Sequence, residues 1–233
     1  MALILHIETS TNVCSVALSH DGNILFSQIN REGPSHASLI GPYLDEALKI
    51  AESNEMKLDA VAVSSGPGSY TGLRIGVAAA KGVCYAKHIP LIAVPTLELL
   101  ADTYLKRNQL PDEALVRPVM DARRMEVYSA VYDSTGHCLK PAEAIVVDNH
   151  TFDAELAAHP VYFVGNGALK LHQVIHSKQA HFEETLLPVA ESMIALAEKA
   201  YGEGRFENVA YFEPFYLKDF VATVKKHLIP PIN

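Results

Sequence analysis

The order of predicted strands and helices repeats once along the chain, and this repeat constrains the fold more than any other feature. Asp21-Gly22 is typical of a two-residue hairpin, so it separates two strands in the first half. A helical apolar pattern over 36–53 follows these strands, with further strands and helices after it. The predicted βββαβαβα elements of this half are 2–8, 13–19, 23–29, 36–53, 58–64, 71–87, 91–94 and 96–106.

The second half repeats this order more faintly. Its predicted elements are strands at 115–120, 126–132 and 137–147, a helix at 151–157, a strand at 161–164, and helices at 168–177 and 189–202. Two successive βββαβα units predict an α/β protein of two ribonuclease-H-like lobes, the plan of the actin-like or sugar-kinase-like ATPase fold. We expect lobes at 1–107 and 108–233, divided at the polar linker near Pro111. The last helix or the tail is expected to pack back on the first lobe.

The charge balance and the chain start narrow the function classes. A net charge of −8 argues against independent binding of nucleic acid, which normally requires a basic patch. No apolar run reaches the ~18 residues of a membrane helix, and the start lacks the features of a signal peptide. Cys14, Cys84 and Cys138 are expected to be buried free thiols in a reducing compartment. We therefore expect a cytoplasmic protein without a membrane partner.

A glycine-rich segment, residues 66–76, joins a predicted strand to a predicted helix. A strand, a glycine turn and a helix N-terminus together can bind an anion. The spacing matches neither the dinucleotide nor the P-loop motif, and Leu73 and Arg74 follow Gly72 where a P-loop has its lysine and hydroxyl. The segment is therefore expected mainly to position the helix.

Small residues recur every three or four positions along that helix, from Gly72 through Gly76 to Ala79. Such a ridge permits close approach of another element, either inside the same lobe or from a second chain. We favour a second chain, so that Gly72→Leu or Gly76→Leu should abolish dimerisation and leave a folded monomer. The predicted interface lies on helices 36–53 and 71–87 and contains Leu39, Tyr43, Tyr70, Thr71, Gly72, Arg74, Gly76, Ala79 and Val83.

Three turns lie where this fold class grips a nucleotide, and each has weakened chemistry. The first has Glu8 and no glycine before Gly22, and its hydroxyls either donate to an anion or satisfy their own backbone. The second, 121–124, is either an anion clamp or a solvated surface turn. The third, 165–167, either grips adenosine or makes a tight turn. The possible vestigial nucleotide site contains Glu8, Thr9, Ser10, Thr11, Asp121, Arg123, Gly165 and Gly167.

The sequence predicts neither a metal site nor a catalytic residue. His172 and His176 lie four positions apart on a predicted helix, but no third ligand accompanies them. Ser69 lacks the flanking glycines of a nucleophile elbow. We therefore expect no tightly bound cofactor.

Five segments spread over nearly the whole chain resemble the TsaB (YeaZ) family. The segment at 66–76, Gly-Pro-Gly-Ser-Tyr-Thr-Gly-Leu-Arg-Ile-Gly, is the most specific of them. The others are Ile-Glu-Thr-Ser at 7–10, Val-Pro-Thr-Leu-Glu-Leu-Leu at 94–100, Asp-Ala-Arg-Arg at 121–124 and Pro-Phe-Tyr-Leu-Lys at 214–218.

The resemblance implies a bacterial cytoplasmic protein with the actin-like fold that forms homodimers. It also implies pairing with TsaD, the paralogue that transfers a threonylcarbamoyl group to the adenosine next to the tRNA anticodon, and with the ATPase TsaE. In that family the helices corresponding to 36–53 and 71–87 form the dimer surface. Glu8 departs from the family's aspartate, and the metal-binding histidines of TsaD have no match in the first lobe.

The sequence thus predicts a non-catalytic scaffold subunit that binds and stabilises a TsaD-type threonylcarbamoyltransferase. Its contact with tRNA would be indirect, and ATP or ADP would bind at most at the interface between the two subunits. The alternative is an active ATPase or kinase of the same fold, whose expected aspartate–glycine hairpin this chain lacks.

Overall fold

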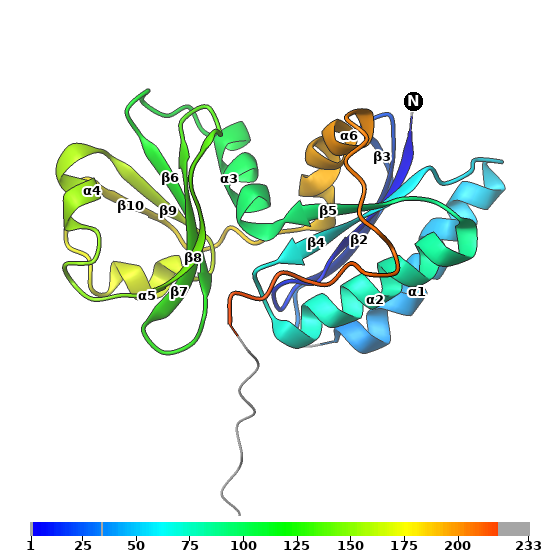
Figure 1. The fold of residues 1–233 in the computed structure, drawn as a ribbon, viewed down its shortest axis with the longest axis horizontal. Coiled ribbons are helices and arrows are strands. Elements are labelled where there is room, and N and C mark those ends of the chain that lie inside the picture. The colour runs from blue at the N-terminus through cyan, green and yellow to red at the C-terminus, as the bar shows by residue number, and fades with distance from the viewer. Residues whose placement is uncertain (1, 34, 219–233) are drawn as a thin grey trace, which may run out of the picture.

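The computed structural model describes residues 2–33 and 35–218, which form two five-stranded sheets (Figure 1). The first sheet has the order β3-β2-β1-β4-β5; β1, β2 and β3 are antiparallel, and β4 and β5 run parallel to β1. Its strands are β1 (Leu3–Glu8), β2 (Cys14–His20), β3 (Asn23–Asn30), β4 (Ala60–Gly66) and β5 (Leu91–Pro95). Asp21 and Gly22 have φ of 51° and 76°, so the predicted hairpin turn is confirmed.

The second sheet repeats this arrangement in the order β10-β9-β6-β7-β8. Its strands are β6 (Leu115–Asp121), β7 (Glu126–Asp133), β8 (Cys138–Val146), β9 (Val161–Val164) and β10 (Ala180–Glu183). Again three antiparallel strands are followed by two parallel ones. The predicted fold of two ribonuclease-H-like lobes is therefore confirmed, although β10 was not predicted.

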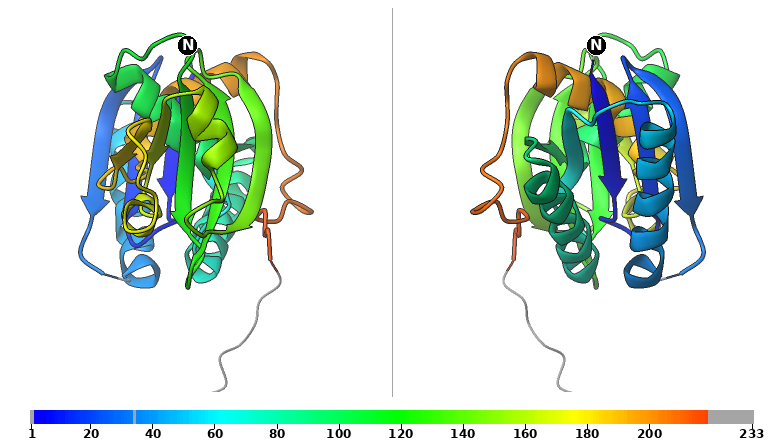
Figure 2. Two further views of the ribbon diagram at one scale, coloured as in Figure 1. Left: turned by 90° about the vertical axis from the view of Figure 1, so that its left-hand side faces the viewer. Right: turned by 90° about the vertical axis from the view of Figure 1, so that its right-hand side faces the viewer.

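Helices cover both faces of each sheet (Figures 1 and 2). The helices are α1 (His36–Ser53), α2 (Tyr70–Lys87), α3 (Thr96–Arg107), α4 (Asp153–Ala158), α5 (Ala168–His172) and α6 (Ile194–Gly202), with a 3₁₀ turn η1 (Ala190–Met193) before α6. In the first lobe, α1 and α2 lie side by side on one face. In the second lobe, α4 and α5 cover one face.

The remaining helices cross between the lobes. Leu97 and Leu100 of α3 pack against Val116 and Met120 of the second sheet, although α3 precedes the linker. In return, η1 and α6 pack against the first sheet, where Ala197 joins a cluster with residues of β1, β4 and β5. The sequence boundary after residue 107 therefore does not coincide with a boundary in packing.

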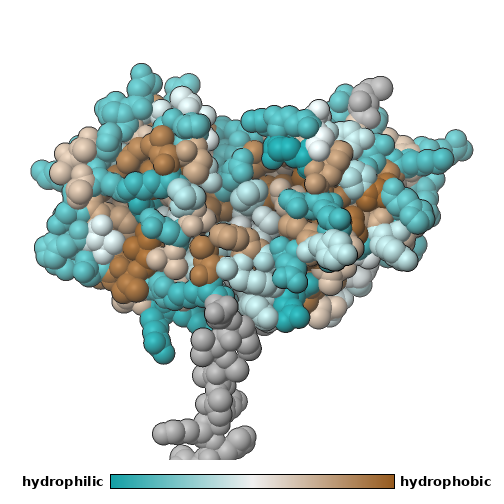
Figure 3. Space-filling model, in the orientation of Figure 1, coloured by the Kyte–Doolittle hydropathy of each residue, from teal (hydrophilic) through white to brown (hydrophobic). Residues whose placement is uncertain are grey.

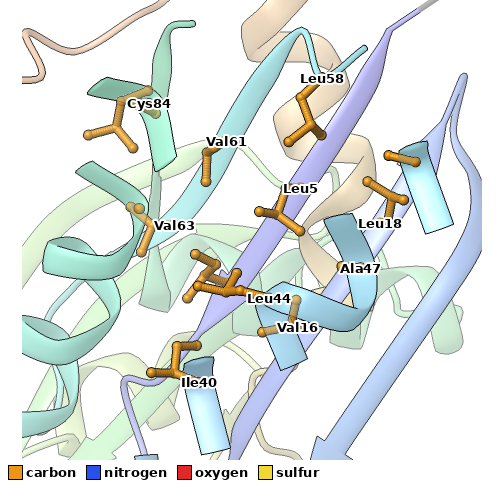
Figure 4. Packing of buried hydrophobic residues seen from close by; sticks show 14 of the residues in the cluster. Leu5, Val16, Leu18, Ile40, Leu44, Ala47, Leu58, Val61, Val63 and Cys84 are labelled. Atoms are coloured by element: carbon orange, nitrogen blue, oxygen red, sulfur yellow. The ribbon is translucent and has the colours of Figure 1, made fainter. Parts of the chain in front are cut away.

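The alternation of β1 explains how the first sheet is buried on both faces. Leu3, Leu5 and Ile7 pack toward α1 and α2, whereas Ile4 faces η1 and α6. Figure 4 shows the α1 contribution, in which Ile40 and Leu44 meet the strands. Full burial of each such side chain contributes about 1.5–3 kcal/mol. This core fixes the position of α2 relative to the end of β1.

Two local predictions were wrong. Helix α5 ends at His172, five residues earlier than expected. Cys138 is exposed rather than buried, whereas Cys14 and Cys84 are buried free thiols as predicted. Among residues 2–33 and 35–218, no helix is long and apolar enough to cross a bilayer.

Candidate functional site

The turn after β1 lies directly against the glycine-rich start of α2. Thr9 Oγ1 donates a hydrogen bond to the carbonyl oxygen of Gly72 (2.8 Å), and Ser69 N donates to the carbonyl oxygen of Ser10 (2.7 Å). A Cβ atom at Gly72 would lie 2.1 Å from the carbonyl oxygen of Thr9, and one at Gly76 would lie 2.2 Å from Thr9 Oγ1. The recurring glycines therefore serve the close approach of this turn to the helix.

Gly72 and Gly76 are accordingly buried inside their own lobe. Their assignment to a surface for a second chain is wrong, and packing within the lobe, the alternative that we did not favour, is correct. A leucine at either position would collide with the β1–β2 turn, so it would not leave a normally folded monomer.

The other predicted interface positions lie at the surface or at its edge. Thr71 and Arg74 are exposed, and Leu39, Tyr43, Ala79 and Val83 are half-buried along the α1–α2 pair. Tyr70 is also half-buried, and its hydroxyl accepts a hydrogen bond from Arg74 Nη1 (2.8 Å).

Sequence reasoning missed a second row of small residues on α2. Ala78 and Gly82 are exposed one helical turn apart, and a Cβ at Gly82 would have no atom within 4 Å. Tyr85, on the next turn, is 78% exposed. The row of Gly72 and Gly76 therefore faces the interior of the lobe, and the exposed row of small residues lies on a different face of the helix. This exposed row runs through Ala78 and Gly82.

Glu8 is fully buried beneath the turn, where Ser10 N donates to its Oε1 (2.6 Å). Burial raises the pKa of the Glu8 carboxyl, and hydrogen bonds from Ser10, Ser64 and Thr9 oppose this rise. Burial, together with the nearby Glu8, also raises the pKa of the Cys14 thiol to about 11. Glu8 and the buried Thr9 do not line the cleft, so their assignment to a nucleotide site is not supported by their positions.

We predict that Glu8→Gln stabilises the protein at alkaline pH. The pKa of Glu8 in the folded protein lies above its ordinary value of 4.5. The contribution of protonated Glu8 to the free energy of unfolding is therefore complete below pH 4.5, and it is lost as pH rises through the folded pKa. Each unit of the rise costs about 1.4 kcal/mol once Glu8 is ionised in both states. Urea unfolding near pH 8 should show a higher free energy of unfolding for the variant than for the unmodified protein, and this difference should be smaller at about pH 4. An equal advantage at both would contradict an ionisation effect.

A cleft of about 630 Å³ opens between the two lobes. Both lobes and the C-terminal segment line it, and four of the predicted vestigial residues are among its walls: Ser10, Thr11, Asp121 and Arg123. Gly165 and Gly167 are buried behind it. A Cβ at Gly165, whose φ is +117°, would lie 2.6 Å from the carbonyl oxygen of Val119. These glycines thus meet the needs of a tight turn against β6.

The carboxylate of Asp121 is paired inside the second lobe. Lys170 Nζ donates to its Oδ1 (2.6 Å) and also to the carbonyl oxygens of Arg124 (2.8 Å) and Glu126 (2.9 Å). The backbone N–H of Arg123 donates to the same carboxylate oxygen (2.7 Å). Lys170 therefore fixes the turn and partly neutralises Asp121. No sequence motif indicated this role for Lys170.

The two histidines singled out in the sequence do not form a site. His176 lies beyond the end of α5, so the helical spacing on which the pair depended is absent. His172 Nδ1 instead lies 2.8 Å from Glu184 Oε1, and its ring stacks on Phe182. Within 2–33 and 35–218, no group of three or more His, Cys, Asp or Glu side chains is placed to hold a metal ion.

Comparison with known proteins gives consistent matches over both lobes. Residues 30–226 match the model of the family described as "TsaD: tRNA N6-adenosine threonylcarbamoyltransferase". The "tRNA threonylcarbamoyladenosine biosynthesis protein TsaB" of Escherichia coli is 32% identical over 231 residues, which cover 95% of this chain and 97% of the relative. The protein of the same name from Haemophilus influenzae is 29% identical, covering 95% and 96%.

Two solved structures from Pseudomonas aeruginosa share the whole architecture. One, described as similar to the peptidase YeaZ, superposes with a TM-score of 0.78 at 28% identity and covers 94% of this chain and 100% of its own. The other, described as YeaZ, gives a TM-score of 0.73 at 28% identity, covering 93% and 100%.

Proposed function

We propose a function from the premise that this chain belongs to the TsaB family, within the wider group that the TsaD family model describes. The resemblance inferred from the sequence is therefore confirmed, and the protein has a role in forming threonylcarbamoyladenosine in tRNA. We propose that this role is that of a non-catalytic scaffold, which binds and stabilises a TsaD-type threonylcarbamoyltransferase through α1 and α2.

One observation carries this proposal: the inner face of α2 packs against its own lobe, while its outer face presents a row of small residues next to an exposed tyrosine. Gly72 and Gly76 seat the helix on the β1–β2 turn. On the other side, Ala78 and Gly82 are exposed beside the half-buried Val83. A partner helix can approach closely at Ala78 and Gly82, where the side chains are small, and the exposed Tyr85 on the next turn offers an aromatic contact. The adjacent α1 would widen the contact surface.

The state of the cleft supports a non-catalytic role. Glu8, which replaces the metal-organising aspartate, is buried away from the cleft, and Asp121 is paired with Lys170. Glu8 therefore does not face the cleft, and the Asp121 carboxylate, which does, is already partly neutralised by Lys170. The catalytic metal, the activated threonylcarbamoyl group and the tRNA would be bound by the partner. The net charge of −8 fits this division of labour.

We further propose that the chain forms a homodimer through the same helices and exchanges this partner for the TsaD-type subunit. A TsaE-type ATPase would join the complex, ATP or ADP would bind at the interface between subunits, and tRNA would be contacted only indirectly. The cytoplasm is the proposed location, because the substrate of the pathway named for its relatives is tRNA.

The competing function is an active ATPase or kinase of the same fold. We predict that calorimetry of the isolated protein with ATP and Mg²⁺ shows at most weak binding, and that a phosphate-release assay shows no turnover above a denatured control. Micromolar binding accompanied by turnover would favour the competing function and would contradict the scaffold role.

A further inference from the structure

The C-terminal segment from Arg205 to Lys218, here called the strap, leaves α6 and crosses the first lobe (Figure 1). Its beginning is tied to the edge of the first sheet, where Glu207 N donates to the carbonyl oxygen of Leu91 (2.8 Å) in an antiparallel bridge. This contact also covers part of the open edge of β5. The beginning of the strap is thus anchored to the first lobe by backbone hydrogen bonding to β5.

Lys81 on α2 holds the middle of the strap. Its Nζ donates to the carbonyl oxygens of Ala210 (3.1 Å) and Phe212 (3.0 Å). A hydrogen bond from a charged donor is stronger than one between neutral groups. Removing this one amine would leave both carbonyl groups without their shared donor.

The end of the strap enters the cleft. Phe215 N donates to the carbonyl oxygen of Ser65 (2.7 Å) at the end of β4, and the ring of Tyr216 lies 4.8 Å from the ring of Tyr70. A Cβ at Gly66 would lie 2.6 Å from the carbonyl oxygen of Phe215. Since the φ of Gly66 is also +105°, this position suits glycine on two grounds. The strap thus has a fitted seat at the cleft.

The last described residue of the strap reaches the second lobe. Lys218 forms an ion pair with Glu126 at the start of β7. Residues 215–218 also line the cleft together with the turns of both lobes. The strap therefore adds a non-covalent connection between lobes that the chain also joins covalently. Figure 3 shows its face of the molecule as a mixture of hydrophobic and hydrophilic residues.

We propose that the strap is a latch, which fixes the spacing of the lobes and restricts the entry of phosphate-bearing anions into the cleft. Clefts between two lobes usually admit ligands by hinge motion, and a tie across the mouth opposes that motion. Arg123 and Arg124 supply the positive charge on the cleft wall, and among the ion pairs of the described residues neither takes part. The strap contacts α2 through Lys81 and Tyr70, but the latch is argued from contacts within this chain alone.

The test compares Lys81→Met with Lys87→Met, a matched lysine in the last turn of the same helix. In the full chain, Lys81→Met should increase hydrogen exchange at the Phe215 amide about tenfold or more, because that amide is protected by the seated strap. Titration with inorganic pyrophosphate should show stronger binding to the same variant. Lys87→Met should behave as the unmodified protein in both measurements.

A second experiment reverses the charges of the Lys218–Glu126 ion pair. Lys218→Glu should also accelerate exchange at Phe215, and Lys218→Glu combined with Glu126→Lys should restore protection. Unchanged exchange in Lys81→Met would contradict the latch. Faster exchange without a gain in pyrophosphate binding would contradict its control of the cleft. Thermal unfolding of each variant distinguishes local release of the strap from loss of the fold.

Discussion

Gly72→Ala is expected to lower the free energy of unfolding by about 2–3 kcal/mol, although it adds a single methyl group to a helix. The added Cβ would lie 2.1 Å from the carbonyl oxygen of Thr9, an atom of the backbone that cannot move without displacing the β1–β2 turn. Urea unfolding followed by circular dichroism measures the loss. Because Thr9 and Ser10 also bond to the start of α2, both the turn and the helix would be disturbed.

Gly82→Ala in the same helix is the matched control. A Cβ at this position meets no atom within 4 Å, so the substitution should raise stability by about 0.5–1 kcal/mol through helix propensity alone. Opposite signs at the two glycines would establish that Gly72 is an internal contact. If Gly72→Ala left unfolding unchanged and removed only dimerisation, our original assignment of Gly72 to a partner surface would be restored.

Gly82→Arg is expected to abolish homodimerisation while the monomer remains folded. The position is exposed, and arginine favours a helix more than glycine does, so the lobe itself should tolerate the change. A long charged side chain would separate the facing helices and would have to be desolvated in the interface. We expect the dimer dissociation constant to rise about 100-fold or more, equivalent to about 3 kcal/mol. Light scattering over a concentration series measures it.

Gly82→Ala again serves as the control, because it leaves the surface smooth and should preserve the dimer. An added charge away from both helices, such as Glu113→Arg at an exposed position before β6, tests whether any added charge disturbs assembly. Dimerisation of Gly82→Arg at the concentrations of the unmodified protein would remove the outer face of α2 from the interface.

Much of the fold could be predicted because its signals are local. Hairpin residues such as Asp21-Gly22 and the nearly continuous apolar run of β1 are patterns of neighbouring residues in the sequence. The strand β10, Ala180–Glu183, was missed because four residues carry too little alternation. The packing of α3 could not be predicted either. Leu97 packs with residues of the second sheet and Leu99 with residues of the first, and the sequence does not show which sheet each apolar residue contacts.

The candidate site was harder to predict, because its contacts join distant segments. The spacing of Gly72 and Gly76 indicated a close approach, but it could not show that a turn of the same lobe makes the contact. Lys81 bonds to residues 129 and 131 positions away through backbone carbonyl groups, which have no sequence signature. Burial of Glu8 likewise follows from tertiary packing, and only the structure reveals it.

The most direct test of the scaffold role is titration of the chain with the TsaD-type subunit of the same organism, monitored by calorimetry and analytical ultracentrifugation. The unmodified protein and Gly82→Ala should form a heteromeric complex of similar affinity. Gly82→Arg should fail to do so at the same concentrations while melting at a similar or higher temperature. Undiminished binding of Gly82→Arg would contradict the proposal that the outer face of α2 holds the catalytic partner.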